Sequence, residues 1–263
     1  MKDLEGKVVL VSGVGPGLGR AVADRALARG ANVVLGDIAP HRLGEIADEL
    51  DPSGRRVVWA ECDITDDDSC RELVARGSER FHGIDALVNV AAFDTVFGSL
   101  MNSAFDEWDP TIEVNVKGTL RMTRAAVPAL KARGRGSIVI ISSVGFIKPP
   151  TNAPHQLAYA SSKGALMTAM RYLAAELGPD GIRVNTVTPG WKLGPVLEGY
   201  LRSVAEEQGV EYGTVLEPIK SSLALRELAT DYDVGEAALF LCSEQSRLIT
   251  GQNIHVDGGE IFG

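Results

Sequence analysis

Short runs of β-branched and other apolar residues alternate with helical patterns along almost the whole chain. Most runs are continuously apolar, which is typical of strands in a parallel sheet covered on both faces. The predicted strands are residues 8–11, 33–36, 57–60, 86–89, 137–141, 184–188 and 253–256. The predicted helices are residues 18–29, 41–50, 67–80, 105–133, 159–177 and 233–242. This alternation predicts an α/β fold: a doubly wound, Rossmann-like parallel sheet of seven strands with helices on both faces, joined by right-handed crossovers.

Residues 191–230 are the one long departure from the alternation. No linker, internal repeat or low-complexity tract divides the 263 residues, so we expect a single domain over residues 1–263. Within it, residues 191–230 form an insertion before the last helix and strand, with glycines amid amphipathic pieces. Long insertions of this kind are usually lids or binding loops. We expect a lid, and a plain surface excursion is the alternative.

Charge and hydropathy exclude several classes of protein. The net charge of −9, the pI near 5.0 and the absence of Lys/Arg runs argue against a nucleic-acid partner. The longest uncharged apolar stretch, residues 138–147, is too short to cross a bilayer, and the charged start lacks the apolar segment of a signal peptide. Cys62, Cys70 and Cys242 are scattered, without metal-ligand spacing, and are expected to be buried reduced thiols. We therefore expect a soluble cytoplasmic protein without a membrane partner or a metal site.

A glycine-rich loop follows the first predicted strand. Residues 12–19 read Ser-Gly-Val-Gly-Pro-Gly-Leu-Gly, and a helix is predicted directly afterwards. Glycines let the backbone turn sharply and bring the helix N-terminus against a pyrophosphate. The spacing is Gly13-x-x-x-Gly17-x-Gly19; the G-x-G-x-x-G pattern fails because Arg20 stands at its third glycine. The glycine-rich loop therefore predicts a binding site for a dinucleotide.

Asp37 ends the second predicted strand, 20 residues after Gly17. A carboxylate there can accept hydrogen bonds from both hydroxyls of the adenosine ribose and would repel a 2′-phosphate. No Arg or Lys lies in residues 14–18, and the nearest cation, Arg42, is one helical step away. NAD is therefore expected rather than NADP.

Tyr159 and Lys163 form a Tyr-x-x-x-Lys unit at the start of a predicted helix. Positions i and i+4 share a helix face, so the phenol and the ammonium are expected to point into the same space. A cation held there would lower the pKa of the tyrosine from about 10 and make it a general acid or base.

Together these features resemble the short-chain dehydrogenase/reductase family in its compact one-domain form. Further motifs follow in the family's order along nearly the whole chain. They are Cys62-Asp63-Ile64 after the third strand, Asn89-Val90-Ala91-Ala92 after the fourth, Asn115 in the next helix, Ser142-Ser143 after the fifth strand, Pro189-Gly190 after the sixth, and residues 250–259 at the end. The family's Asn-Asn-Ala-Gly motif is matched only at Asn89 and Ala91.

The resemblance implies a role for each of these residues. Tyr159 would exchange the proton of a carbonyl/alcohol pair, while Lys163 would lower its pKa and bind the nicotinamide ribose. Ser143 would hydrogen-bond the substrate oxygen, with Ser142 as the alternative. Asn115 would hold a water linking Lys163 to solvent, unless it only braces a helix kink. The implied cofactor contacts are Gly13, Gly17, Leu18, Gly19, Asp37, Asp63, Ile64, Asn89, Ala91, Tyr159, Lys163, Pro189, Gly190 and Leu193.

Two departures from the family pattern concern the substrate side of the site. The segment between Ser143 and Tyr159 is a few residues longer than the family norm, so residues 148–155 are expected to bulge at the rim, with His155 exposed. After Pro-Gly the family often has an apolar residue and then Thr, whereas residues 191–194 read Trp-Lys-Leu-Gly. The hydroxyl that would steady the nicotinamide amide is missing or displaced, and backbone groups near Leu193 would substitute. Trp191 is expected to pack within the lid.

The resulting expectation is an NAD-dependent oxidoreductase that acts on CH–OH groups and interconverts a secondary alcohol and a ketone. The substrate is expected to be a mostly apolar or ring-containing small molecule, because several apolar residues fall in segments that should border the pocket. These are Phe93, Val96, Phe97, Phe146, Trp191, Leu193 and Leu197. The alternatives are an NADP-dependent carbonyl or 3-oxoacyl reductase, and a non-catalytic dinucleotide sensor. By family analogy, residues 105–133 and 159–177 pair between subunits in a homotetramer or a dimer.

Overall fold

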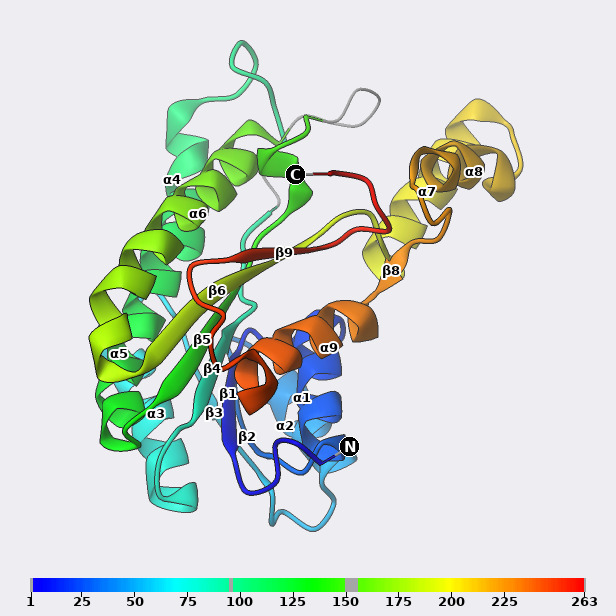
Figure 1. Ribbon diagram of the computed structural model, residues 1–263. Coiled ribbons are helices and arrows are strands. Elements are labelled where there is room, and N and C mark those ends of the chain that lie inside the picture. Colours follow the sequence, from blue (N-terminus) through cyan, green and yellow to red (C-terminus); the bar gives the residue numbers. More distant parts are fainter. Residues whose placement is uncertain (1, 95–96, 150–155, 263) are drawn as a thin grey trace.

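Seven parallel strands form the central sheet of the computed structural model, which describes residues 2–94, 97–149 and 156–262 (Figure 1). In spatial order the strands are β3 (Val57–Glu61), β2 (Asn32–Asp37), β1 (Val8–Ser12), β4 (Ala86–Asn89), β5 (Gly136–Ile141), β6 (Ile182–Pro189) and β9 (Asn253–Val256). Each neighbouring pair in this sheet is parallel. The predicted Rossmann-like sheet is confirmed, with strand bounds that differ by no more than two residues.

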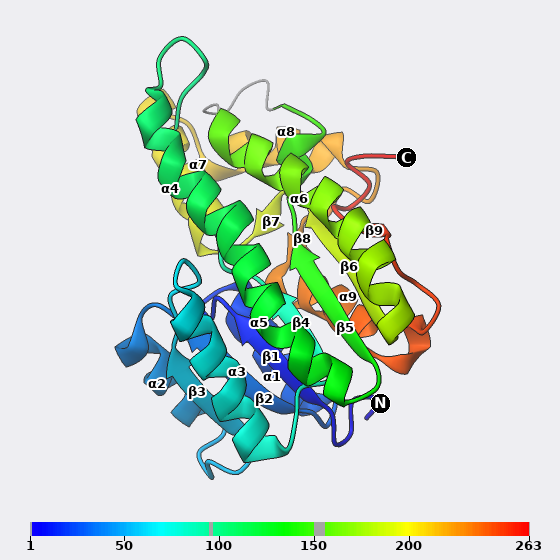
Figure 2. The ribbon, with the colours of Figure 1, turned by 90° about the vertical axis from the view of Figure 1, so that its left-hand side faces the viewer.

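Helices cover both faces of the sheet. Helices α3 (Asp67–Phe81), α5 (Thr119–Ala132) and α6 (Leu157–Leu177) form the layer turned to the viewer in Figure 2. Helices α1 (Leu18–Ala28), α2 (Pro40–Leu50) and α9 (Asp231–Cys242) cover the other face. Alternate side chains of β1 enter different cores: Val9 and Val11 pack with the α1 layer, whereas Val8 and Leu10 pack with the α3 layer. Both faces of the strands are therefore buried, which explains why the runs are continuously apolar. Within the described residues, no helix combines the length and the hydropathy needed to cross a membrane.

The strand order reverses between β1 and β4, and the candidate site lies at this switch point of the sheet. From β1 the chain moves outward through β2 and β3, then returns to place β4 on the opposite side of β1. Ligands bind open parallel sheets at such a switch point, beyond the carboxyl ends of the strands. The two strand ends are tied together, because the amides of Val90 and Ala91 both donate to the Ser12 carbonyl at 2.8 Å.

The prediction of one regular helix over residues 105–133 is wrong. A 3₁₀ turn (Phe105–Trp108), α4 (Asp109–Ile112) and a π-helical segment (Glu113–Gly118) precede α5. The π-helical segment coincides with two close contacts. The Asn115 side chain bonds the Phe93 backbone, and a Cβ at Gly118 would lie 2.7 Å from Ile64. Isolated π-helical turns inside helices are frequent at functional sites.

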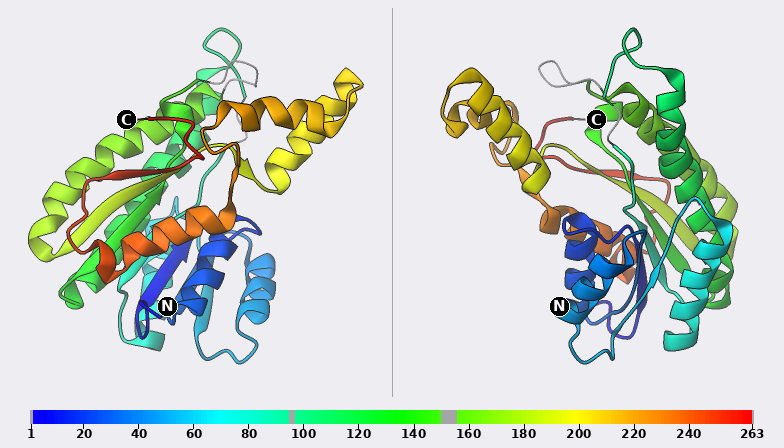
Figure 3. Two further views of the ribbon diagram at one scale, coloured as in Figure 1. Left: turned by 45° about the vertical axis from the view of Figure 1, so that its right-hand side comes forward. Right: turned by 180° about the vertical axis from the view of Figure 1, so that it is seen from behind.

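Residues 191–230, which we call the arm, carry two helices that the sequence did not predict. The short strands β7 (Lys192–Leu193) and β8 (Ala229–Thr230) pair in parallel at the base of the arm. Helices α7 (Pro195–Gln208) and α8 (Tyr212–Ser222) pack against each other and project away from the sheet (Figures 1 and 3). Their small core contains Leu201, Leu223 and Leu228, and Trp191 packs against it, as expected.

Candidate active site

A cleft of about 430 Å³ opens at the switch point of the sheet. Its walls come from the glycine loop, the end of β2, the start of the β3–α3 connection and the segment after β4. Seven of the predicted cofactor contacts line it: Gly13, Leu18, Gly19, Asp37, Asp63, Ile64 and Ala91. The other seven, Gly17, Asn89, Tyr159, Lys163, Pro189, Gly190 and Leu193, lie outside this lining.

Close packing explains two of the loop glycines. Gly13 has φ +93°, and a Cβ there would lie 2.3 Å from the Ala91 nitrogen. A Cβ at Gly19 would lie 2.1 Å from the Gly13 carbonyl oxygen. Side chains at either position would therefore separate β1, α1 and β4.

The N-terminus of α1 leaves its amide groups to the cleft side of the loop. Gly17 is the N-cap residue, no side chain caps it, and no acidic residue lies in the first turn of α1. Uncapped amides and the helix dipole favour an anion at this position. The loop and the carboxylate of Asp37 thus fit the pyrophosphate and the adenosine ribose of a dinucleotide.

Arg42 contacts Asp37, which the sequence analysis did not foresee. The Asp37 carboxylate is almost buried, and its Oδ1 accepts hydrogen bonds from the Ala39 amide at 3.0 Å and from Arg42 Nη2 at 2.9 Å. The half-exposed Arg42 side chain also lines the cleft. Arg42 lies in the first turn of α2, so the fold of the connection after β2 brings the cation to the carboxylate. The end of the cleft at Asp37 therefore carries both charges.

The segment after β3 closes the same end of the cleft. Asp63 Oδ1 accepts hydrogen bonds from the amide and the hydroxyl of Thr65, at 2.8 and 2.7 Å. Ile64 is buried and packs against Gly118. Asn89 does not line the cleft. Its buried Nδ2 donates to Thr123 Oγ1 at 3.3 Å and so connects β4 to α5.

Tyr159 and Lys163 share one face of α6, as the spacing predicted. The Lys163 Nζ lies 5.4 Å from the centre of the Tyr159 ring and donates to the Ile141 carbonyl at 2.9 Å. Burial lowers the pKa of Lys163 to about 8, because the ammonium is removed from water; the Asp94 carboxylate opposes this shift.

The pKa of Tyr159 is raised to about 12 in this structure, opposite to the direction expected from the sequence. Burial of the phenol is the main cause, and the negative charge of Asp94 adds to it. A hydrogen bond with Ser143 acts in the other direction. In the protein alone, burial therefore outweighs the groups that would stabilise the phenolate.

The two adjacent serines have different surroundings. Ser143 hydrogen-bonds Tyr159, and its Oγ also accepts from the Gly145 amide at 3.2 Å. The Oγ of Ser142 is buried, and no described residue hydrogen-bonds it. Of the two serine candidates, Ser143 is therefore the one that the structure brings to the tyrosine.

The Asn115 side chain is fully engaged with the protein. Its Oδ1 accepts from the Phe93 amide at 2.6 Å, and its Nδ2 donates to the Phe93 carbonyl and to Ser162 Oγ, both at 3.0 Å. This arrangement matches the alternative of a braced helix irregularity. It also positions the chain after β4 relative to α6, because Ser162 lies between Tyr159 and Lys163.

The remaining predicted residues lie on the arm side of the site. Pro189 ends β6, and a Cβ at Gly190 would lie 2.7 Å from Asp257 and 2.8 Å from Glu260. Leu193 is in β7 and is 36% exposed, so it is available at the base of the arm.

The apolar residues predicted to border the substrate are dispersed. Phe93 lines the cleft, Phe97 is exposed, and Phe146 packs against the α3-side core. Leu197 is buried within the arm. Val96, His155 and most of the expected bulge at 148–155 lie outside the described residues.

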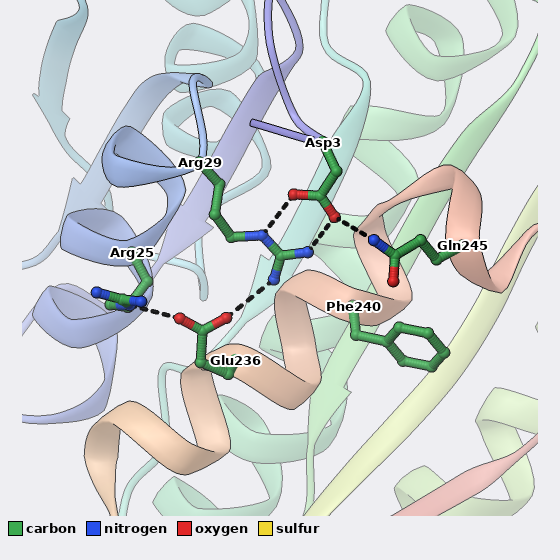
Figure 4. Close-up of a pocket in the computed structure, with 6 residues that line it drawn as sticks. All are labelled: Asp3, Arg25, Arg29, Glu236, Phe240 and Gln245. Carbon is green, nitrogen blue, oxygen red and sulfur yellow. Dashed lines mark hydrogen bonds and ion pairs between the residues drawn. The ribbon is translucent and has the colours of Figure 1, made fainter. Parts of the chain in front are cut away.

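A second pocket, of about 300 Å³, lies on another part of the surface (Figure 4). Arg29 pairs there with Asp3 and Glu236, and Arg25 pairs with Glu236. These ion pairs join the N-terminal segment, α1 and α9. The charges in the pocket therefore serve to connect elements of the fold, away from the tyrosine and the glycine loop.

Comparison with known proteins agrees with this fold. A family model described as "Enoyl-(Acyl carrier protein) reductase" matches residues 13–260. The chain is 35% identical to oxidoreductase UcpA of Escherichia coli (strain K12) over 98% of this chain and 96% of that protein. It is 34% identical to human dehydrogenase/reductase SDR family member 4, over 97% of this chain and 88% of that protein.

A solved structure has the same architecture. Carveol dehydrogenase from Mycobacterium avium, in complex with NAD, superposes with a TM-score of 0.88 at 30% identity, covering 98% of both chains. The fold, the arrangement of the site and these matches together show that the chain belongs to the short-chain dehydrogenase/reductase family.

Proposed function

We propose that the protein is an NAD-dependent dehydrogenase/reductase that interconverts a secondary alcohol and a ketone. The observation that carries the proposal is the convergence of Ser143, Tyr159 and Lys163 at the end of the sheet that also bears the glycine loop. A hydroxyl paired with a phenol, beside a buried amine, is a set of groups that can orient an oxygen and move its proton. The NAD complex of carveol dehydrogenase, named for an alcohol, supports both the cofactor and the reaction class.

The chain's own residues divide the chemistry between them. Ser143 donates a hydrogen bond to the substrate oxygen and holds it near the phenol. In the oxidation direction Tyr159 accepts the hydroxyl proton of the alcohol, and in reduction it returns a proton to the carbonyl oxygen. NAD, when bound, supplies the hydride acceptor, and its positively charged ring favours the phenolate. The ammonium of Lys163 acts in the same direction.

The cofactor preference rests on Asp37. Its carboxylate repels a 2′-phosphate, and one oxygen is engaged by Arg42 and the Ala39 amide. Arg42 supports NADP as the second candidate, because a half-exposed guanidinium in the same cleft can bind a phosphate. In that case the enzyme would be a carbonyl or 3-oxoacyl reductase.

We further propose a mostly apolar or ring-containing substrate, entering between the segment after β4 and the arm. Phe93 in the cleft and the exposed Phe97 support this class, because substrate pockets are lined chiefly by apolar groups.

The test is a panel of cyclic, steroidal, terpenoid and linear secondary alcohols with NAD or NADP, followed by the absorbance of the reduced cofactor. We expect reduction of NAD with at least one cyclic alcohol. No turnover with any alcohol or ketone, despite measurable binding of NADH, would contradict the proposal.

A further inference from the structure

An ion pair joins the arm to the start of α9, and its carboxylate lies next to Gly17 of the glycine loop. Lys192 of β7 contacts Asp231, the first residue of α9, and the two side chains are about 29% and 14% exposed. The pairing of β7 with β8 brings them together, because β8 ends at Thr230, immediately before Asp231.

The position of Asp231 places this pair at the phosphate-binding loop. A Cβ built on Gly17 would lie 3.4 Å from Asp231 Oδ2 and 3.7 Å from Oδ1. Gly17 is the uncapped N-cap residue of α1. A carboxylate therefore already stands next to the helix end that would receive the pyrophosphate, and its charge would oppose that anion.

Lys192 is held at the same place by its partner. The Cβ position of Gly194 lies 3.5 Å from Asp231 Oδ2 and 3.9 Å from Lys192 Nζ. The ammonium of Lys192 is thus a positive charge that the arm brings to Asp231, next to the N-cap residue of α1.

We propose that Lys192 is a pyrophosphate-binding residue, delivered by the arm and held in place by Asp231. This inference rests on the proposed dinucleotide function. When the dinucleotide binds, Lys192 shares its ammonium between Asp231 and the pyrophosphate, so the base of the arm and the cofactor are linked electrostatically. Asp231 orients the lysine but weakens the binding of the anion.

The two partners therefore have opposite effects on ligand binding, whereas an ion pair that only stabilises the fold would give effects of one sign. Lys192→Met should weaken the binding of ADP-ribose, which carries the pyrophosphate without the nicotinamide, by about tenfold. Asp231→Asn should strengthen it by a few-fold, because the charge that repels the anion is removed. Adenosine, which has no phosphate, should bind wild type and both variants alike.

The experiment is a calorimetric titration of the wild-type chain and both variants with ADP-ribose and with adenosine, at low and high salt. Lys192→Met should also reduce the salt dependence of ADP-ribose binding. The matched control is the surface pair of Lys131, at the end of α5, and Asp180, in the 3₁₀ turn (Gly178–Asp180) after α6. The two side chains are 2.6 Å apart, and these helix ends face away from the cleft. Lys131→Met and Asp180→Asn make the same changes of charge and should leave both ligands unaffected. Circular dichroism and Tm confirm that each variant is folded.

Equal ADP-ribose affinity in wild type and Lys192→Met would overturn the role of Lys192, as would an equal loss of ADP-ribose and adenosine binding. Weaker ADP-ribose binding in Asp231→Asn would overturn the opposing role of Asp231. If wild type bound neither ADP-ribose nor NADH, the proposed dinucleotide function would fail together with this inference. If wild type bound ADP-ribose and Lys192→Met bound it equally well, only the role of Lys192 would fail, and the proposed dinucleotide function would stand.

Discussion

Lys163 lies on the same face of α6 as Tyr159, with its Nζ 5.4 Å from the ring centre, yet it donates to the Ile141 carbonyl at 2.9 Å. The lysine is buried and its pKa is lowered, while the pKa of the tyrosine is raised. Each shift favours the uncharged form of its residue, because burial is the main cause of both. If Tyr159 is the acid and base that we propose, its phenolate needs further stabilisation at moderate pH, and the positive ring of a bound nicotinamide cofactor would supply it.

In wild type, the free energy of unfolding should rise between about pH 8 and pH 10.5, and Lys163→Met should abolish this rise. The pKa of Lys163 is about 8 in the folded chain, against 10.5 for a lysine exposed to water, so the unfolded chain binds more protons in this interval. The free energy of unfolding therefore increases with pH there, by on the order of 3 kcal/mol at most. Denaturant unfolding of wild type and variant at pH 7.5 and pH 10 measures this increase. Identical pH dependence in wild type and variant would show that the ammonium is not destabilised by burial.

Tyr159→Phe should lower kcat by about 10²- to 10⁴-fold, because the group that exchanges the proton is lost while the ring remains. NADH binding, followed by fluorescence, should stay close to that of wild type. Substantial residual turnover would remove Tyr159 from its assigned role as acid and base.

Ser143→Ala and Ser142→Ala should separate the two serines. The first removes the hydroxyl that meets Tyr159, so kcat should fall by about tenfold or more. The second removes a buried hydroxyl that has no hydrogen-bond partner among the described residues, so kcat should change by less than about twofold and Tm should not fall. Steady-state kinetics and thermal unfolding of both variants give the comparison, and the reverse pattern of kcat would assign the role to Ser142.

Asp37→Asn and Arg42→Ala should test the choice of cofactor. If Asp37 repels the 2′-phosphate, Asp37→Asn should lower the ratio of kcat/KM for NAD to that for NADP by about tenfold or more. Arg42→Ala should raise that ratio, because the remaining carboxylate loses its positive neighbour. An unchanged ratio in Asp37→Asn would leave the carboxylate a purely structural role.

The chain should form a tetramer, or a dimer, through α5 and α6. Tyr172 of α6 is 75% exposed in the single chain, which suits a residue that is covered on assembly. Tyr172→Arg should shift the mass measured by light scattering at micromolar concentration toward smaller species. A monomeric mass for wild type would contradict this expectation.

The sheet could be predicted because its signal is local. Most strands are short apolar runs, because burial on both faces of the sheet excludes polar residues from them, as at residues 8–11 and 86–88. The glycine loop was also readable, because the positive φ of Gly13 and the close packing of Gly19 admit no side chain. The helices of the arm were missed, because their apolar faces pack on each other rather than on the sheet.

The internal break in the 105–133 segment depends on contacts distant in sequence. Residues 113–118 have no helix-breaking composition at their centre; the π-helical turn accompanies the bonds from Asn115 to Phe93 and Ser162. Likewise, the contact of Arg42 with Asp37 arises from the path of the chain between β2 and α2. The spacing of residues along a single helix carries no information about the contacts of Asn115 or about the contact of Arg42 with Asp37.

From its residue pattern alone, this chain specified a doubly wound parallel sheet, a glycine-rich loop after the first strand and a tyrosine and lysine on one helix face. These are consequences of short-range geometry, so periodicity and spacing report them. Tertiary packing decided the protonation preferences of Tyr159 and Lys163, which serine lies beside Tyr159, and the pairing of Lys192 with Asp231 next to Gly17. Those properties depend on desolvation and on charges brought together from separate elements, which no local pattern contains.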